Sequence, residues 1–228
     1  MAGSERQEEL IETHRAIQEA ELPYILIGGW AVSAFQPRLT MDVDMVIPSS
    51  ALDEYERVLD GLGFEKELDP DVSNIYDGRM IQFEKQVGEN SIAFDALVAA
   101  VRCRQTDAKW SYEYLEKHSV RKPLKIAPGL ESRIPEPALL FALKLHSGRR
   151  ADARDLVVIG SSVDWENIER HVHRGDLGQL RGNIDQVLAE IQKDQFRDSF
   201  HGVFRQDELD ESDVDNLESF LDELREAL

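Results

Sequence analysis

The stretch GGWAVSAFQPRLTMDVDMVIP, residues 28–48, places two aspartates inside what otherwise resembles a buried strand. Its last part, MDVDMVIP (41–48), alternates between apolar and acidic residues and closes on Pro48, which is typical of a β-strand. Aspartate is depleted in strands, and a buried carboxylate without a partner is costly. We therefore expect a cation beside Asp42 and Asp44.

A third carboxylate strengthens this expectation. Residues two positions apart on a strand face the same side, so Asp42 and Asp44 should project together with Cβ atoms ~7 Å apart. Asp95 interrupts SIAFDALVAAV (91–101), and no lysine or arginine lies within six positions of it. Such oxygen ligands, with no nearby histidine or cysteine, favour Mg²⁺ or Mn²⁺ bound by Asp42, Asp44 and Asp95. The alternative is that Asp42 and Asp44 bind no metal and simply lie on the exposed face of an edge strand.

The glycines at the start of the stretch indicate a phosphate site. Gly28 and Gly29 stand where an apolar strand, YILI (24–27), ends and a short helix, WAVSAF (30–35), begins. Backbone N–H groups at the start of a helix bind phosphate without a side chain. Arg38 and Thr40 follow directly before the acidic strand, so we interpret them as further nucleotide contacts.

The remaining pattern predicts an α+β fold with a small mixed sheet flanked by helices and an all-helical C-terminal region. We expect a core domain over 1–128 and a helical domain over 129–228. The expected elements are helices over 4–21, 49–63, 164–192 and 213–227, a hairpin of strands 79–87 and 91–101 around the turn 88–90, and a short strand over 124–128. The acidic final helix should pack on the domain.

Composition places the protein in the cytoplasm. No apolar run approaches the roughly 18 residues of a membrane span, and the charged N-terminus does not resemble a secretory signal. A single cysteine, Cys103, excludes an internal disulfide and suits a reducing compartment. We expect no membrane partner.

The charge is strongly negative and evenly spread. Lysine and arginine number 26 against 45 acidic residues, which gives a net charge of −19. The acids follow the whole chain, through 53–71, 152–176 and 207–226, as on a solvated surface. We interpret this as adaptation to a salt-rich, halophilic cytoplasm.

The segment GGWAVSAFQPRLTMDVDMVI resembles the signature of the DNA polymerase β-like nucleotidyltransferase superfamily. That signature is an apolar strand, Gly-Gly or Gly-Ser, a short helix and an aspartate pair on the next strand. The spacing of Arg38, Thr40, Asp42 and Asp44 is similar to the minimal nucleotidyltransferases of the AbiEii toxin type. The family's third acid falls on a later strand, where Asp95 matches it.

The resemblance continues into EPALLFALKLHSGRRADARDLVVI, residues 136–159. It implies that Lys144 contacts nucleotide phosphate, and that Arg154 and Asp155 form the family's arginine–aspartate pair, with Asp155 supporting the active site. Two features depart from the pattern: Gly29 replaces a serine found in many members, and an apolar run follows Asp155.

Several of these residues also have plainer interpretations. Lys144 has no acid within one helical turn and could be a lysine whose stem packs while its amine reaches water. Arg149, Arg150 and Arg154 form a dense basic cluster that could bind triphosphate or acceptor, or be a solvated loop. The histidines of ERHVHRGD (169–176) are two positions apart and poor joint ligands, so we place His171 and His173 at the surface.

The resemblance implies a nucleotidyltransferase with an NTP as substrate and Mg²⁺ or Mn²⁺ as cofactor. The acceptor hydroxyl could belong to the 3′ end of an RNA such as tRNA, as in toxin-like relatives with an antitoxin partner. It could also belong to a protein or to a small molecule such as an aminoglycoside. The alternative is a non-catalytic nucleotide-binding or antitoxin-like protein.

Overall fold

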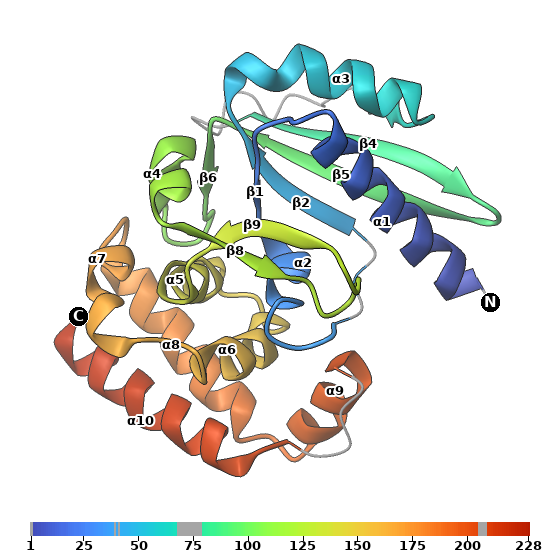
Figure 1. Ribbon diagram of the computed structural model, residues 1–228. Helices are drawn as coiled ribbons and strands as arrows, with labels where there is room; N and C mark the ends of the chain where they lie inside the picture. Colours follow the sequence, from blue (N-terminus) through green and yellow to red (C-terminus); the bar gives the residue numbers. More distant parts are fainter. Residues whose placement is uncertain (1, 39, 41, 68–78, 205–208) are drawn as a thin grey trace.

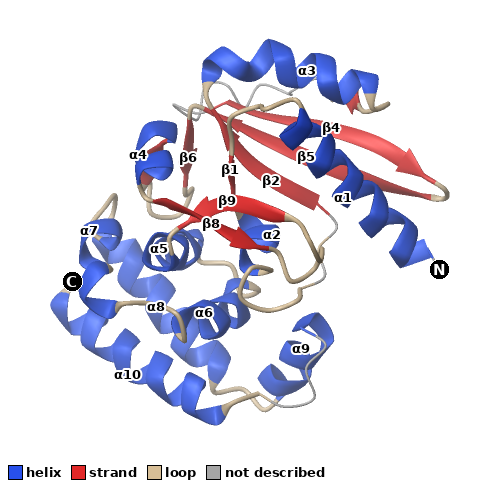
Figure 2. Ribbon diagram, viewed as in Figure 1, coloured by secondary structure: helices blue, strands red, loops and turns tan. Residues whose placement is uncertain are grey.

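A mixed five-stranded sheet forms the centre of the N-terminal half (Figures 1 and 2). The computed structural model describes residues 2–38, 40, 42–67, 79–204 and 209–228. The strand order is β1-β2-β5-β4-β3, with β2 and β5 parallel and the other pairs antiparallel. The strands are β1 (Ile25–Leu26), β2 (Asp42–Ile47), β3 (Glu65–Lys66), β4 (Arg79–Val87) and β5 (Asn90–Val98).

The expected hairpin is confirmed, but its turn has two residues in place of the three expected from the sequence. Val87 pairs with Asn90, so only Gly88 and Glu89 form the loop, and Gly88 has a φ of 63°. The second strand ends at Val98 because Ala99 has a φ of 69°, which a strand does not accommodate. The chain then turns into β6 (Ala100–Arg102), which pairs with β7 (Lys109–Ser111).

Helices cover both faces of the sheet. On one face, α1 (Ala2–Glu19) and α3 (Leu52–Gly61), which follows the 3₁₀ turn η1 (Ser49–Ala51), pack against the apolar side of β2 (Figure 1). The other face of β2 carries Val46, which joins a smaller apolar cluster with Trp110, Leu139 and Leu143. The alternation expected for β2 is therefore confirmed, and its acidic residues share the face on which α5 (Pro137–Ser147) lies.

A second hairpin links the sheet to the helical region. Helix α4 (Tyr112–Lys117) leads into β8 (Ser119–Pro123), which pairs with β9 (Glu131–Pro135). The strand expected over 124–128 is wrong: Leu124 accepts a hydrogen bond from Ala127 and donates one to Leu130, which closes a turn there. Proline at 123 and 128 and glycine at 129 favour this turn over a strand. The proposed domain boundary at 128/129 lies within it.

The C-terminal region is helical after β9, so the expectation of an all-helical region from residue 129 is wrong at its start, where β9 pairs with β8. Besides α5, the elements are α6 (Asp152–Gly160), η3 (Trp165–Asn167), α7 (Glu169–Val172), α8 (Leu177–Ile191), α9 (Gln195–Phe204) and α10 (Glu211–Ala227). The acidic helix α10 packs on α6 and α8 (Figure 1) through Leu217, Leu221 and Leu224. The α+β fold class is confirmed. Among the described helices, none combines the length and apolar character needed to cross a bilayer.

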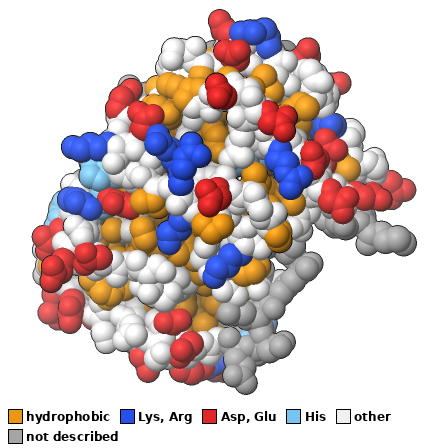
Figure 3. Space-filling model, viewed as in Figure 1, with side chains coloured by type: hydrophobic (Ala, Val, Ile, Leu, Met, Phe, Trp, Pro, Cys, Tyr) orange, Lys and Arg blue, Asp and Glu red, His pale blue; other side chains and the backbone are white. Residues whose placement is uncertain are grey.

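The acidic surface is dispersed. On the face shown in Figure 3, acidic side chains occupy several separate places, with basic side chains between them. This matches the even spacing of acids along the chain, while adaptation to salt stays a hypothesis.

Three histidines lie inside the fold. His14 is stacked on Trp30 and contacts the hydroxyl of Tyr24 at 3.2 Å. His146 and His171 are equally buried, so the surface position expected for His171 is wrong. Burial lowers the pKa of each of the three to about 4. A neutral imidazole is therefore the buried form.

We expect His14 to make the protein acid-sensitive. Its pKa is about 4 in the fold against an ordinary value of 6.5, so the unfolded chain takes up the proton first as the pH falls. Stability is intact above pH ~6.5 and is lost towards pH 4, by about 2 kcal/mol at pH 5. When the pH is lowered from 7.5 to 5, the free energy of unfolding of His14→Gln should fall by about 2 kcal/mol less than that of the parent. Urea unfolding at the two pH values measures this difference. The exposed His173→Gln should not show it; an equal response in both variants would contradict the assignment.

Candidate active site

Three carboxylates meet on one face of the sheet. In the parallel register of β2 and β5, Asp44 lies directly beside Asp95. Neighbouring residues in register face the same side, and Asp42 shares that side because it is two positions from Asp44. Asp42 is exposed, Asp44 is partly covered and Asp95 is buried. The structure thus places the three acids that the sequence predicts as metal ligands on one face of two adjacent strands, although their ligand atoms do not form one tight group.

The electrostatics of this cluster favour a bound cation. Burial, together with the charges of Asp42 and Asp95, raises the pKa of Asp44 to about 7. Burial also raises the pKa of Asp95, although a hydrogen bond from Gln82 opposes the rise. Among the described residues, no lysine or arginine forms an ion pair with Asp44 or Asp95, and the nearby Lys144 is engaged by other acids. Hard oxygen donors that have no ion-pair partner fit Mg²⁺ or Mn²⁺.

Gln82 orients Asp95, and sequence reasoning missed it. The two residues are register partners between β4 and β5, and the Gln82 side-chain amide donates to Asp95 Oδ1 at 2.9 Å. The turn expected over 88–90 would have shifted the register by one residue and turned this side chain to the opposite face. A two-residue turn at Gly88 and Glu89 would have identified it.

Gly28 allows the backbone to approach Asp44. It has a φ of 63°, and a Cβ there would lie 2.0 Å from Asp44 Oδ2. The helix α2 (Gly28–Val32) begins at this residue, two positions earlier than the sequence indicates. The first residue of α2 therefore adjoins the face of the sheet that carries Asp44.

Gly29 makes room for an arginine. A Cβ at Gly29 would lie 1.9 Å from Arg38 Nη1 and 3.0 Å from Thr40 Oγ1. The guanidinium of Arg38 thus occupies the space that a serine side chain would need. Thr40 donates to Asp42 Oδ1 at 2.7 Å and so fixes the exposed member of the acid cluster.

We expect Gly28→Ala to damage the site and the fold together. Both the positive φ and the contact with Asp44 oppose a Cβ, so the free energy of unfolding should fall by about 1–3 kcal/mol. Gly182→Ala is a matched control: this exposed glycine in α8 has open space around its Cβ position and should gain about 0.5–1 kcal/mol. Urea unfolding measures both. Equal stability of Gly28→Ala and the parent would contradict the close approach.

Lys144 lies in a buried ion-pair network. Its ammonium contacts Asp155 Oδ2 at 2.7 Å and Asp152 Oδ1 at 2.8 Å, and only 5% of its side chain is exposed. Asp155 Oδ1 also accepts from Arg38 Nε at 2.8 Å. Burial alone would lower the pKa of Lys144, but the two aspartates outweigh it and raise it. The interpretation of Lys144 as a lysine without an acid partner is wrong, because its partners lie on the next helix, α6.

Asp152 extends the network towards the surface. It accepts from Ser147 and, at 3.2 Å, from Arg149 Nε. Burial would raise the pKa of Asp152, yet Lys144 and Arg149 hold it below its ordinary value. Asp152 stays ionised as a result, and sequence reasoning missed it because it lies eight residues beyond Lys144.

The predicted arginine cluster divides in the fold. Arg149 lies near enough to Asp44 for each to affect the other's pKa. Arg154 instead donates to the backbone and hydroxyl oxygens of Ser199 on α9, at 3.0 and 3.2 Å. Nucleotide binding by Arg154 stays a prediction, and this contact gives it a second role in holding α9.

Known structures share this arrangement of elements. The solution structure of the antibiotic-resistance factor ANT(2'')-Ia aligns with a TM-score of 0.52 and 16% identity over 75% of this chain and 90% of its own. The crystal structure of ANT(2'')-Ia in complex with adenylyl-2''-tobramycin aligns with a TM-score of 0.52 and 16% identity, over 77% of this chain and 97% of its own. This chain has a nucleotidyltransferase fold. That agrees with the resemblance to the DNA polymerase β-like superfamily.

Other comparisons add little to this assignment. The lincosamide antibiotic adenylyltransferase LnuA, with lincomycin bound, aligns at a TM-score of 0.47 and 13% identity over 71% of this chain and 96% of its own. No protein-family model and no curated protein sequence matches the chain.

A cavity of about 470 Å³ in this nucleotidyltransferase fold is lined by Asp44, but not by Asp42 or Asp95. Of the residues predicted from sequence, it touches Gly28, Asp44 and Lys144 among those described. Its wall combines basic and apolar side chains, including Arg149, Ser147, Leu97, Leu140 and Leu143. Such a wall can hold a charged group at one end and an apolar ring at the other.

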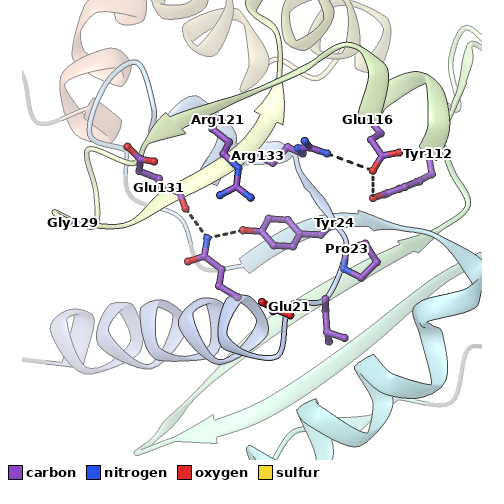
Figure 4. Close-up of a pocket in the computed structure, with 11 residues that line it drawn as sticks. Glu21, Pro23, Tyr24, Tyr112, Glu116, Arg121, Gly129, Glu131 and Arg133 are labelled. Carbon is purple, nitrogen blue, oxygen red and sulfur yellow. Dashed lines mark hydrogen bonds and ion pairs between the residues drawn. The ribbon is translucent and has the colours of Figure 1, made fainter.

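A larger cavity, of about 680 Å³, lies elsewhere in the nucleotidyltransferase fold (Figure 4). It is bordered by the end of α1, by α4 and by the β8–β9 hairpin. Arg133 pairs with Glu116 at 3.4 Å within it, and Gln18 donates to Tyr24. None of the residues predicted for the site lines this cavity, so we assign the chemistry to the smaller cavity beside the acids.

Proposed function

We propose that this chain is a metal-dependent nucleotidyltransferase that moves an NMP from an NTP to an acceptor hydroxyl. The observation that carries the proposal is the β2–β5 register, which puts Asp44 beside Asp95 on the face that also bears Asp42. The cavity lined by Asp44 and Lys144, and the fold, support it. Asp42, Asp44 and Asp95 would hold Mg²⁺ or Mn²⁺, which when bound neutralises charge on the phosphates and on the departing pyrophosphate.

The chain itself supplies the contacts for the NTP. Gly28 lies against Asp44 at the start of α2, so its backbone is close enough to the acid cluster to contact phosphate oxygens of a bound NTP. The ammonium of Lys144 has three donors, of which Asp152 and Asp155 take two, so one remains for a phosphate oxygen. Asp155 contacts both Lys144 and Arg38, and the Arg38 guanidinium lies against Gly29, so these two residues link the lysine to the glycine pair.

Asp95 acts as the base in this proposal. The acceptor oxygen forms a bond to the α-phosphorus while the bond from the α-phosphorus to the bridging oxygen breaks, and pyrophosphate leaves with that electron pair. The hydroxyl proton passes to Asp95, whose Oδ1 is held by Gln82 and whose burial raises its pKa. A raised pKa makes the carboxylate a stronger base.

The acceptor we favour is a cationic small molecule. A net charge of −19 attracts cations and repels the phosphates of RNA. A cavity of about 470 Å³ is also in the range of small-molecule sites. The 3′ end of tRNA or another RNA, in a toxin-like role with an antitoxin partner, and a hydroxyl of a protein are the other acceptors that the experiment distinguishes.

The experiment is a transfer assay with purified full-length protein in molar KCl. Each α-labelled NTP is supplied with Mg²⁺ or Mn²⁺ and, in turn, with aminoglycosides, total RNA or cell-extract protein. We expect label on one acceptor class, dependent on the divalent ion and absent from Asp44→Asn. Bound NTP whose label reaches no acceptor would overturn the transferase proposal and favour a non-catalytic nucleotide-binding or antitoxin-like protein.

A further inference from the structure

A second group of metal-ligating side chains lies outside the acid cluster. His118 ends α4, Glu136 precedes α5, and His171 belongs to α7. One ligand atom from each lies within 4.8 Å of the other two. Glu136 Oε1 is 3.0 Å from both His118 Nδ1 and His171 Nε2. Three segments that are distant in sequence thus converge on one point.

The hydrogen bonds around His171 leave its Nε2 without a proton. Tyr114 has one hydroxyl hydrogen, which it donates to the carbonyl of Arg170 at 3.2 Å. Arg170 Nε donates to His171 Nε2 at 3.1 Å, so Nε2 accepts, and the proton of the neutral ring lies on Nδ1, 2.9 Å from the same hydroxyl. The Nε2 lone pair accepts from Arg170, and Glu136 Oε1 lies 3.0 Å from the same nitrogen. A histidine ligand whose second nitrogen is held by a hydrogen bond is typical of metal sites.

A cation already occupies this point. Arg170 donates from Nη2 to Glu136 Oε1 at 3.0 Å and from Nε to His171 Nε2 at 3.1 Å. The two acceptors lie 3.0 Å apart, and the guanidinium supplies the positive charge between them. The Arg170 side chain is 46% exposed, so it can rotate into solvent and leave the acceptors free.

We propose that His118, Glu136 and His171 bind one Zn²⁺ ion in exchange for the guanidinium of Arg170. Two imidazoles and one carboxylate suit Zn²⁺ and disfavour Mg²⁺, which prefers oxygen ligands. A tetrahedral site with bonds of about 2.0–2.1 Å separates its ligand atoms by about 3.3–3.5 Å, and each imidazole nitrogen here lies 3.0 Å from Glu136 Oε1. A water molecule completes the coordination. The ion ties the helical region to the end of the sheet domain.

The test measures Zn²⁺ affinity of chelator-treated full-length protein by competition with a chromophoric chelator, with excess Mg²⁺ present to occupy the acid cluster. We expect one Zn²⁺ per chain. His118→Gln and His171→Gln should each weaken binding by at least about 100-fold. Arg170→Ala should strengthen it by roughly 10-fold, because no cation then needs to be displaced. His173→Gln, at an exposed position two residues from His171, is the matched control.

Arg170→Ala separates the metal site from a mere hydrogen-bond network. A network loses stability when Arg170 is removed and gains no metal affinity, whereas a metal site gains affinity. Co²⁺ added to the parent protein should show the intense visible absorption of a tetrahedral site, a readout that does not depend on whether His171→Gln folds. Absence of Zn²⁺ from both the parent and Arg170→Ala, or binding that His118→Gln leaves unchanged, would overturn the proposal.

Discussion

Asp44→Asn should abolish nucleotidyl transfer while leaving the protein at least as stable as the parent in metal-free buffer. The variant removes a metal ligand, so the rate should fall by at least about 10³-fold. It also removes one of three neighbouring carboxylates in a poorly solvated place, where burial and Asp42 already raise the pKa of Asp44 to about 7. Relief of that repulsion should keep or raise Tm. Label transfer and thermal unfolding in EDTA measure the two effects.

The matched control is Asp60→Asn on α3, an exposed aspartate remote from the acid cluster. It should alter neither the transfer rate nor Tm, because an exposed carboxylate contributes little to either. A variant at Asp44 that keeps full activity would remove the acid cluster from the mechanism. One that loses activity only because it unfolds would show that Asp44 is structural.

Asp155→Ala should cause the largest loss of stability of any single substitution proposed for this site. Asp155 is fully buried and is shared by Arg38 and Lys144 at 2.8 and 2.7 Å. Its removal leaves two cations inside the fold, of which Lys144 keeps only Asp152. Removing one partner of a buried ion pair costs about 3–5 kcal/mol. For a chain of this size, we expect Tm to fall by about 10 °C or more.

Two variants show whether the loss comes from unpaired charge. Asp198→Ala removes an exposed aspartate on α9 and should change the free energy of unfolding by less than about 0.5 kcal/mol. Lys144→Met combined with Asp155→Ala should recover part of the loss, since the buried ammonium is gone. A double variant as unstable as the sum of its two single variants would instead point to lost packing.

The β4–β5 hairpin shows that its two strands can be predicted from the sequence while their register cannot. Strands 79–87 and 91–101 are apparent from β-propensity and a glycine turn, because those signals are local. The register depends on whether two or three residues form the loop. With Gly88 and Glu89 alone in the turn, Gln82 faces Asp95; with Asn90 included, it would not. A one-residue difference in the loop therefore decides which side chain donates to Asp95.

The helical network illustrates a different limit. The EPALLFALKLH motif predicts a site role for Lys144, but its acid partners, Asp152 and Asp155, belong to α6. Their approach depends on how α5 and α6 pack. Arg154 shows the same limit. It stands next to Asp155 in the sequence, but in the fold its guanidinium donates to Ser199 on α9. Contacts between helices are not encoded in spacing along one helix.

The sequence by itself determined that Asp42 and Asp44 share one face of a strand, since side chains alternate with a period of two in any strand. It also determined that a glycine pair ends the preceding strand. Only the tertiary structure decided that β5 lies parallel to β2 with Asp95 beside Asp44, and that Arg38 fills the space above Gly29. The physical reason is that alternation is a property of the local backbone. Strand order, register and ion pairing instead depend on which distant segments bury their apolar faces together.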